Sequence, residues 1–290
     1  MKIQVDDMPT NSVSRRMRNN CRQIRLGCRK TVLMIFGILM ALFGVAGCRS
    51  VPVTGRTQLL LTTSSYENQL GEEGYQEYKA QFPRSGNARY NQALERCGRA
   101  IAEVADQDDF NWEFVVLETE TQNAFCLPGG KVAVYSGLMD VMKNEAELAC
   151  VVAHEAAHAI ARHGGERISW GYLQNLGALG VALGFNNETA NAVYGIGTQL
   201  GVMLPFSREN EYEADEIGLI LMAKAGYDPQ AAIDFWSRFS EGKTPSWTET
   251  ITSTHPCDAD RIQQFRENLP KAEEYYRQAA APKGKGVIFR

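Results

Sequence analysis

Residues 150–165, with the sequence CVVAHEAAHAIARHGG, contain side chains that could bind a metal and activate water. In a helix, positions i and i+4 share a face with Cβ atoms about 5–6 Å apart, so His154 and His158 can direct two imidazole nitrogens at one ion. Two imidazoles and a carboxylate suit Zn²⁺, which keeps a further position open for water. The spacing predicts a zinc hydrolase in which Zn²⁺ lowers the pKa of a bound water and Glu155 removes its proton.

An alanine-rich helix that happens to carry two histidines is the competing interpretation, because this motif alone is only a hypothesis. The whole chain has only four histidines, and two of them fall within the motif. A third ligand is expected from the acidic segment 207–218, SRENEYEADEIG. Glu211 and Asp215 are one turn apart, so Glu211 can bind the metal while Asp215 accepts the free N–H of a ligand histidine. Spacing alone does not separate Glu211 from Glu213, and a solvated acidic face remains the alternative.

The elements that must position these residues follow from the rest of the pattern. Strands are predicted at 58–61, at 114–119 and on both sides of a Pro-Gly-Gly turn within 123–137. A protease can bind its substrate as an added antiparallel strand. Either Asn123–Cys126 or Lys131–Tyr135 could provide the necessary sheet edge, and two ordinary core strands are the alternative. The candidate substrate contacts are Asn123, Ala124, Phe125 and Lys131.

Helices are predicted over residues 65–82, 88–105, 145–163, 208–225 and 261–279, with one more opened by Pro229 and two apolar pieces within 166–203. Asn144 is expected to cap the motif helix together with Glu147, and Gly164–Gly165 is expected to end it. Residues 283–290 are predicted to form a mobile tail.

The first 47 residues differ in composition from the rest of the chain. They carry eight Lys/Arg against two acids, and Val32–Ala46 is an uncharged run of 15 residues. A membrane-crossing helix needs roughly 20 residues, so a removable secretory signal is favoured over an uncleaved anchor or a buried helix. The following VAGC resembles the lipobox of bacterial lipoproteins, which implies cleavage before Cys48 and acylation of that residue. Arg49 and Ser50, rather than Asp, favour the outer membrane within that resemblance.

The charge of the remaining chain argues against nucleic acid as a partner. Loss of residues 1–47 would leave 22 Lys/Arg against 32 Asp/Glu, a net charge of −10 instead of −4. Four cysteines would remain beyond Cys48, and they could pair outside the cytoplasm or stay as buried thiols. They are Cys97, Cys126, Cys150 and Cys257.

Five segments in order through the chain resemble the HtpX and CAAX-prenyl-protease family of zinc metallopeptidases, in the gluzincin class. They are VTGRTQLLL, NAFCLPGGKVAVYSGLM, NEAELACVVAHEAAHAIARHGGER, SRENEYEADEIGL and STHPCDADRI. The likeness is nearest to the BepA/LoiP-type branch of bacterial envelope lipoproteins. It implies an α+β, mostly helical, zincin-like domain over residues 65–282, with a small antiparallel or mixed sheet beside the motif helix and an arm at 48–64.

The resemblance also implies roles for particular residues. Glu211 matches the third zinc ligand and Asp215 the carboxylate behind a ligand histidine. His255 matches a histidine that can approach the zinc and hold the enzyme inactive, and Arg261 is expected to orient substrate or an oxyanion. The basic residues at the end of the motif helix are interpreted as structural; they are Arg162, His163 and Arg167.

The expected activity is that of a zinc endopeptidase, with one Zn²⁺ per chain, lipid-anchored and facing the periplasm. Its substrates would be unfolded or misassembled envelope proteins. The principal alternative is a chaperone or assembly factor that grips extended chains and has latent protease activity. An aminopeptidase is a weaker alternative, since nothing in the sequence marks an amine-binding site.

Overall fold

The computed structural model describes residues 34, 48–185, 204–240, 255 and 259–289. The predicted signal peptide therefore lies almost wholly outside the described residues. Among the described residues, no helix is both long enough and apolar enough to cross a membrane.

Two small sheets are present in the described part of the chain. In the first, β1 (Cys48–Ser50) pairs antiparallel with β2 (Thr57–Leu59). The second contains β3 (Glu113–Leu117), β4 (Ala124–Leu127) and β5 (Lys131–Tyr135) in the order β3-β5-β4. Strand β5 runs parallel to β3 and antiparallel to β4, so this sheet is mixed. The central position of β5 explains its weak alternation, because both of its faces are buried.

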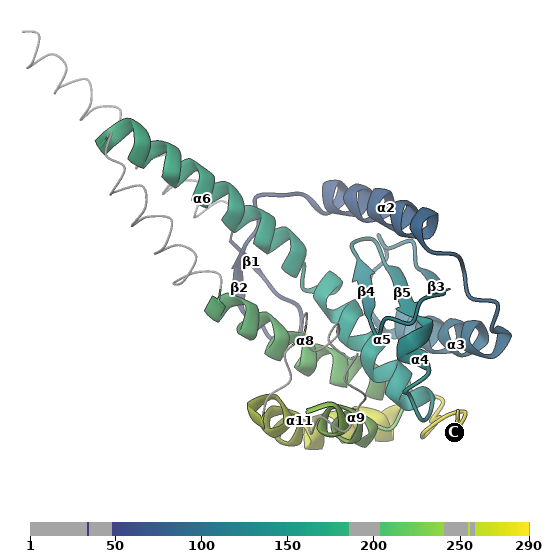
Figure 1. Ribbon diagram of the computed structural model, residues 1–290. Helices are drawn as coiled ribbons and strands as arrows, with labels where there is room; N and C mark the ends of the chain where they lie inside the picture. The colour runs from purple at the N-terminus through teal and green to yellow at the C-terminus, as the bar shows by residue number, and fades with distance from the viewer. Residues whose placement is uncertain (1–33, 35–47, 186–203, 241–254, 256–258, 290) are drawn as a thin grey trace, which may run out of the picture.

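Helices make up most of the described structure, which confirms the α+β, mostly helical prediction. Figure 1 shows α5 between the sheet and α8, with α9 and α11 below α8 and α6 projecting from the body. The helices are α2 (Ser64–Gln81), α3 (Ala88–Val104), α4 (Ser136–Met139), α5 (Glu145–Ile160), α6 (His163–Phe185), α8 (Leu204–Lys224), α9 (Gln230–Ser240) and α11 (Ala259–Gln278).

The motif helix α5 begins where the sequence predicts but ends earlier. The side chain of Asn144 accepts the N–H of Glu147 at 3.1 Å, so the N-cap is confirmed. The helix ends at Ile160 because Arg162 adopts a left-handed φ of 56°. Its guanidinium holds this turn by donating to Glu67 Oε2 at 3.0 Å and to the carbonyl of Thr62 at 2.9 Å. The predicted stop at Gly164–Gly165 is therefore wrong.

Gly165 is required for packing instead. It lies in the first turn of α6, and a Cβ atom there would fall 2.1 Å from Glu67 Oε1.

The C-terminal segment was predicted to be a mobile tail, but residues 283–289 are held by backbone hydrogen bonds. The N–H groups of Glu145 and Ala146, at the start of α5, donate to the carbonyls of Val287 and Lys285. Phe289 N–H donates in return to the carbonyl of Lys143. Two of the N–H groups that a helix start leaves without intrahelical partners are thus satisfied by the tail.

The cysteines of the described core are thiols rather than disulfides. Cys97, Cys126 and Cys150 are unbridged and buried, and Cys257 lies outside the described residues. Burial raises the pKa of each of these three thiols, so they are protonated and inert at neutral pH.

Gly218 sets how closely α8 approaches α5. A Cβ atom there would lie 2.9 Å from both the N and Cα atoms of His154, and backbone atoms cannot move aside as a side chain can. We expect Gly218→Ala to lower the free energy of unfolding by about 1–3 kcal/mol, the usual range for overpacking. It should also weaken metal binding, because the two helices carry the ligands. Chemical denaturation and a zinc titration would measure both effects.

The matched control is Gly171→Ala in α6, where nothing lies within 4 Å of the added Cβ. That substitution should be neutral or stabilise by up to about 1 kcal/mol through helix propensity. Equal behaviour of the two variants would contradict the packing argument.

Candidate metal centre

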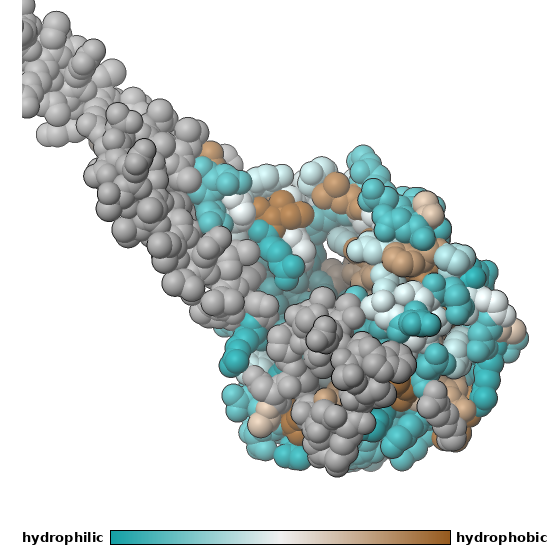
Figure 2. Space-filling model, viewed as in Figure 1, coloured by the Kyte–Doolittle hydropathy of each residue, from teal (hydrophilic) through white to brown (hydrophobic). Residues whose placement is uncertain are grey.

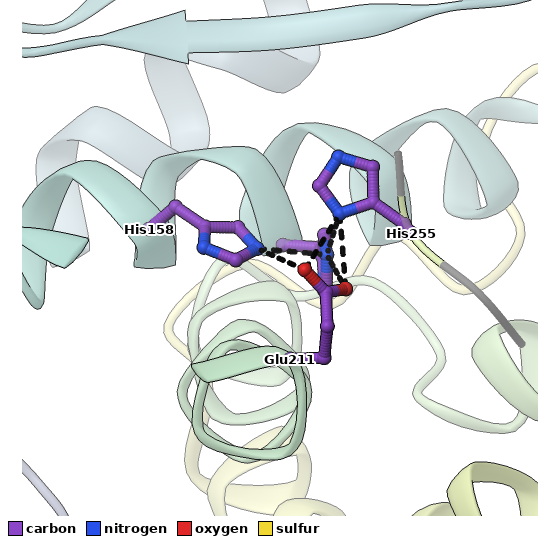
Figure 3. Close-up of side chains that lie close together, drawn as sticks. His158, Glu211 and His255 are labelled. Atoms are coloured by element: carbon purple, nitrogen blue, oxygen red, sulfur yellow. Dashed lines mark hydrogen bonds and ion pairs between the residues drawn. The ribbon is translucent and has the colours of Figure 1, made fainter. Parts of the chain in front are cut away.

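Helices α5 and α8 bring three predicted ligands together. His154 and His158 lie one turn apart on α5, and their Nε2 atoms are 3.2 Å apart. Glu211 on α8 places Oε2 at 3.4 Å from His154 Nε2 and Oε1 at 3.4 Å from His158 Nε2. Figure 3 shows the Glu211 carboxylate pointing from α8 toward the imidazoles. The three side chains that the sequence predicts as ligands therefore lie together, on two separate helices.

The spacing of these donor atoms fits Zn²⁺. Ligand atoms about 2.0–2.1 Å from a tetrahedral zinc are separated from one another by about 3.3 Å. The observed separations of 3.2–3.4 Å match that edge length. A mixed set of two imidazoles and one carboxylate is also the donor chemistry that zinc accepts in catalytic sites.

His255 supplies a fourth potential donor. Its Nδ1 lies 3.2 Å from His154 Nε2 and 2.9 Å from Glu211 Oε2, and Figure 3 shows its ring turned toward the carboxylate. All four residues can place one donor atom within 4.8 Å of one another. His255 would thus lie next to the position that a catalytic zinc site leaves open for water.

Asp215 and Arg261 support the first histidine. Asp215 Oδ1 lies 2.9 Å from His154 Nδ1, and Arg261 donates two hydrogen bonds of 2.7 Å to the Asp215 carboxylate. Burial alone would raise the pKa of Asp215, but the Arg261 charge and the bond to His154 lower it. An ionised Asp215 at this distance would favour the His154 proton on Nδ1 and leave Nε2 available to bind.

The environment of His154 favours a positive charge on its own imidazole ring. Burial opposes a charge on this imidazole, but hydrogen bonds with the carboxylates of Asp215 and Glu211 raise its pKa to about 10. Burial also raises the pKa of Glu211, yet His154 and His255 outweigh that effect and lower it. A carboxylate that stays ionised while almost fully buried is poised to bind a positive ion.

Glu155 lies next to the donor cluster but is not one of its four residues, which is compatible with the predicted role of a base. Its side chain is buried, and burial raises its pKa above the ordinary value. The nearest titratable partner is His255, whose Nε2 lies 3.3 Å from Glu155 Oε1. A carboxylate with a raised pKa accepts and returns a proton near neutral pH more readily than a solvated one.

Arg261 is fully enclosed by this arrangement. Its side chain is 2% exposed, and it also lies 3.3 Å from Glu211 Oε2 and donates to the carbonyl of His255 at 3.2 Å. It therefore positions Asp215, Glu211 and the His255 backbone. Its expected contact with substrate or an oxyanion stays a prediction.

Glu213, which spacing could not distinguish from Glu211, lies away from the donor cluster. Its Oε2 is 3.0 Å from His163 Nε2, and its carboxylate also binds Arg56. Burial opposes the charge, but His163 and Arg56 lower the pKa of Glu213 to about 2. Positions 211 and 213 differ by about 200° around a helix, which is why one carboxylate reaches the metal ligands and the other does not.

The sheet provides one of the two predicted edges beside the site. Strand β4, which holds Ala124 and Phe125 and follows Asn123, is an edge strand of its sheet. Strand β4 packs against α5, and burial and then the nearby Glu155 carboxylate raise the pKa of its residue Cys126.

Lys131 does not fit the predicted contact with substrate, since it belongs to the central strand β5. The residue is 2% exposed, and its Nζ lies 2.9 Å from Glu72 Oε2 and 2.6 Å from Glu113 Oε1. A central strand has partners on both sides, so Lys131–Tyr135 cannot serve as the substrate edge.

Two features of the site were not expected from the sequence. Trp236 of α9 packs edge-on against the His154 ring at 5.8 Å, and Arg261 lies over the same indole at 4.8 Å. His163, interpreted from the sequence as structural, places Nδ1 at 2.8 Å from His158 Nδ1. In the sequence, only the position of His163, five residues after His158, could have indicated the contact between these two rings.

Two histidines and a buried glutamate on one helix, a carboxylate from a second helix and an adjacent edge strand are the features expected of a zinc metallopeptidase. Comparison with known proteins agrees. Residues 88–269 match peptidase family M48, and the chain belongs to that family. It is accordingly a zinc metalloendopeptidase.

Relatives of this chain include mitochondrial and bacterial proteins. It is 33% identical to the mitochondrial metalloendopeptidase OMA1 of Schizosaccharomyces pombe over 82% of this chain and 72% of that protein. The human protein of the same name is 29% identical over 90% of this chain and 52% of its own length. The beta-barrel assembly-enhancing protease of Escherichia coli is 28% identical over 69% of this chain and 43% of its own length. The predicted family is thus confirmed, but the bacterial envelope branch is not specifically favoured.

Proposed function

We propose that this chain is an endopeptidase that cleaves extended segments of unfolded or misassembled proteins, with His154, His158 and Glu211 as the zinc ligands. The observation that carries the proposal is the donor cluster, whose atoms lie 3.2–3.4 Å apart next to the buried Glu155. When bound there, Zn²⁺ would polarise the scissile carbonyl and lower the pKa of water.

The residues of the chain divide the remaining work among them. Glu155 accepts a proton from the attacking water and returns it to the leaving amine, and its raised pKa suits both transfers. Asp215 holds the His154 proton on Nδ1, and Arg261 keeps Asp215 ionised. Strand β4 can align a substrate backbone beside them through main-chain hydrogen bonds.

The surface near β4 suits an unfolded partner. Figure 2 shows a hollow between α6 and α2, with hydrophobic patches beside it. Tyr78 of α2 packs against Phe125 of β4 at 4.5 Å, which connects this wall to the edge strand. Exposed apolar side chains bind the apolar residues that only unfolded chains expose. On these two helices they are Tyr66, Leu70, Tyr78, Tyr172 and Leu176.

Preference for unfolded chains can be tested with one substrate in two states. A small disulfide-bonded protein should resist cleavage in its native form and be cut after reduction and alkylation, because strand addition requires a free backbone. Mass spectrometry of the products would locate the cuts. Equal cleavage rates for both forms would contradict binding by strand addition, and cuts confined to chain ends would indicate an exopeptidase.

His255 is proposed to act as a gate. Its imidazole lies beside both Glu211 and Glu155, so it obstructs the place where water and the scissile carbonyl must enter. We expect His255→Ala to increase the initial rate of casein cleavage several-fold, with the zinc content unchanged. Unchanged or lower activity at full zinc content would oppose this role.

A chaperone with latent protease activity is the second candidate. The observation that favours it is the His255 ring beside Glu211, which would block catalysis at rest. Binding of unfolded protein should then persist in Glu155→Gln, and the cellular phenotype should survive that substitution. A phenotype lost together with cleavage would favour the protease instead.

Attachment to a bacterial membrane through an acylated Cys48, facing the periplasm at the outer membrane, is the proposed location. Cys48 is exposed at the first residue of β1, so a lipid there would not disturb the core. This location rests on the VAGC segment alone, and the relatives of the chain include mitochondrial proteins. Mass spectrometry of the mature N-terminal peptide would decide it, since an unmodified cysteine or an uncleaved leader would refute the anchor.

A further inference from the structure

His163 lies directly behind the zinc-ligand candidate His158, on the side away from the donor cluster. The Nδ1 atoms of the two rings are 2.8 Å apart, and the rings meet at 75°. His158 Nε2 faces Glu211 and His154, so Nδ1 is the nitrogen left over. His163 itself is buried at 3% exposure, so no bulk solvent competes for this contact.

The proton positions in this pair follow from the ligand role of His158. A neutral imidazole that binds a metal through Nε2 carries its proton on Nδ1. That N–H can donate across 2.8 Å only if His163 Nδ1 is a bare acceptor. The proton of a neutral His163 must then lie on Nε2, where Glu213 Oε2 accepts it at 3.0 Å.

Glu213 is fixed in turn by the N-terminal arm. Arg56, in the turn between β1 and β2, donates through Nε to Glu213 Oε2 at 2.8 Å. The same guanidinium forms two bonds with Glu166 of α6, at 3.0 and 2.7 Å, and the hydroxyl of Thr54 donates to Glu213 Oε1. Both carboxylates are buried, so this single cation compensates charges that would otherwise be costly.

We propose that His163 is a positioning residue for His158, and that Arg56 and Glu213 fix its tautomer, so that the N-terminal arm preorganises one zinc ligand. The proposal rests on the zinc site proposed above. It parallels the support that Asp215 gives to His154, but it runs through a neutral imidazole and reaches a segment about 100 residues earlier in the chain, since Arg56 and His158 are 102 positions apart. Partners of this kind typically change metal affinity by about 10–100-fold.

Two substitutions of His163 in the full chain separate the hydrogen bond from the volume of the ring. In His163→Asn, the amide oxygen occupies the place of Nδ1 and can still accept from His158. In His163→Phe, the ring is replaced without an acceptor. We expect the zinc Kd, measured by chelator competition, to rise by about 10–100-fold for the Phe variant and by only about threefold or less for the Asn variant.

The control variant is Glu67→Gln. Glu67 is another buried carboxylate near the arm, and it pairs with Arg162 without touching a ligand. The Glu67→Gln substitution should lower the thermal stability of the zinc-free protein and leave the zinc Kd unchanged. A rise in Kd equal to that of His163→Phe would show general loosening and overturn the proposal.

The tautomer can be observed directly in the zinc-loaded wild type. Two-bond ¹H–¹⁵N correlation spectra should show His163 protonated on Nε2 and not on Nδ1, with Arg56→Ala altering that pattern. A Phe variant whose zinc Kd stays within about twofold of wild type, or a His163 protonated on Nδ1, would overturn the inference. A wild type that binds no zinc would instead refute the proposed function itself.

Discussion

Glu155→Gln is expected to reduce casein cleavage by at least about 10²-fold, with the bound zinc retained. A positioned general base contributes about 10²–10⁴-fold to a rate, and an amide of the same shape cannot accept the proton. The carboxylate lies outside the four-residue donor cluster, so its loss should not release the metal. Initial cleavage rates and metal content, measured on the same preparation, would give both numbers.

Glu147→Gln is the matched control for that experiment. Glu147 is an equally buried glutamate on the same helix, about two turns before His154, where it pairs with Arg238 at 2.7 Å and lies outside the donor cluster. Its replacement should cost stability but leave the activity per folded molecule unchanged. Retained cleavage by zinc-loaded Glu155→Gln would refute the assignment of the base.

The second large effect is expected at Glu211, the proposed zinc ligand on α8. Zinc present at about 1,000 times its Kd should stabilise the wild type by about 4 kcal/mol, because only the folded chain gathers the three donors. Glu211→Gln removes the anionic donor, so zinc affinity, cleavage and this stabilisation should all decrease sharply. Thermal unfolding with and without added Zn²⁺, together with chelator competition, would measure the changes.

Glu209→Gln is the control on the same helix, because Glu209 is exposed and lies outside the donor cluster. It should behave as the wild type does. A Glu211→Gln protein that keeps full zinc affinity would exclude the proposed tripod. Equal losses in both variants would show that the effect comes from the charge of α8 rather than from ligation.

The proposed roles of His255 and His163 predict different effects on activity and on zinc affinity. We propose that His255 competes for the open side of the site, whereas His163 supports the geometry of His158 from behind. Removal of the first should therefore raise activity at constant zinc affinity, and removal of the second should lower affinity. The two roles can be separated within one set of measurements.

The sequence by itself determined the chemistry of the site and its local helical geometry. Two histidines at i and i+4 must share a helix face, and the glutamate after the first must lie beside them, whatever the rest of the fold. The start of α5 was equally local, because Asn144 caps through an N–H only three residues away. The resemblance of five ordered segments added the expectation that Glu211 is the third ligand.

Only the tertiary structure decided the features that depend on distant segments. The left-handed Arg162 that ends α5 is held by Glu67 and Thr62, about 100 residues earlier in the chain, and the tail is ordered by the start of α5. The order β3-β5-β4 made β4 rather than β5 the available edge. Glu211 and Glu213 have the same chemistry and nearly the same place in the sequence. Which of them meets the zinc ligands is fixed by how α8 lies on α5, and spacing within one helix carries no information about that rotation.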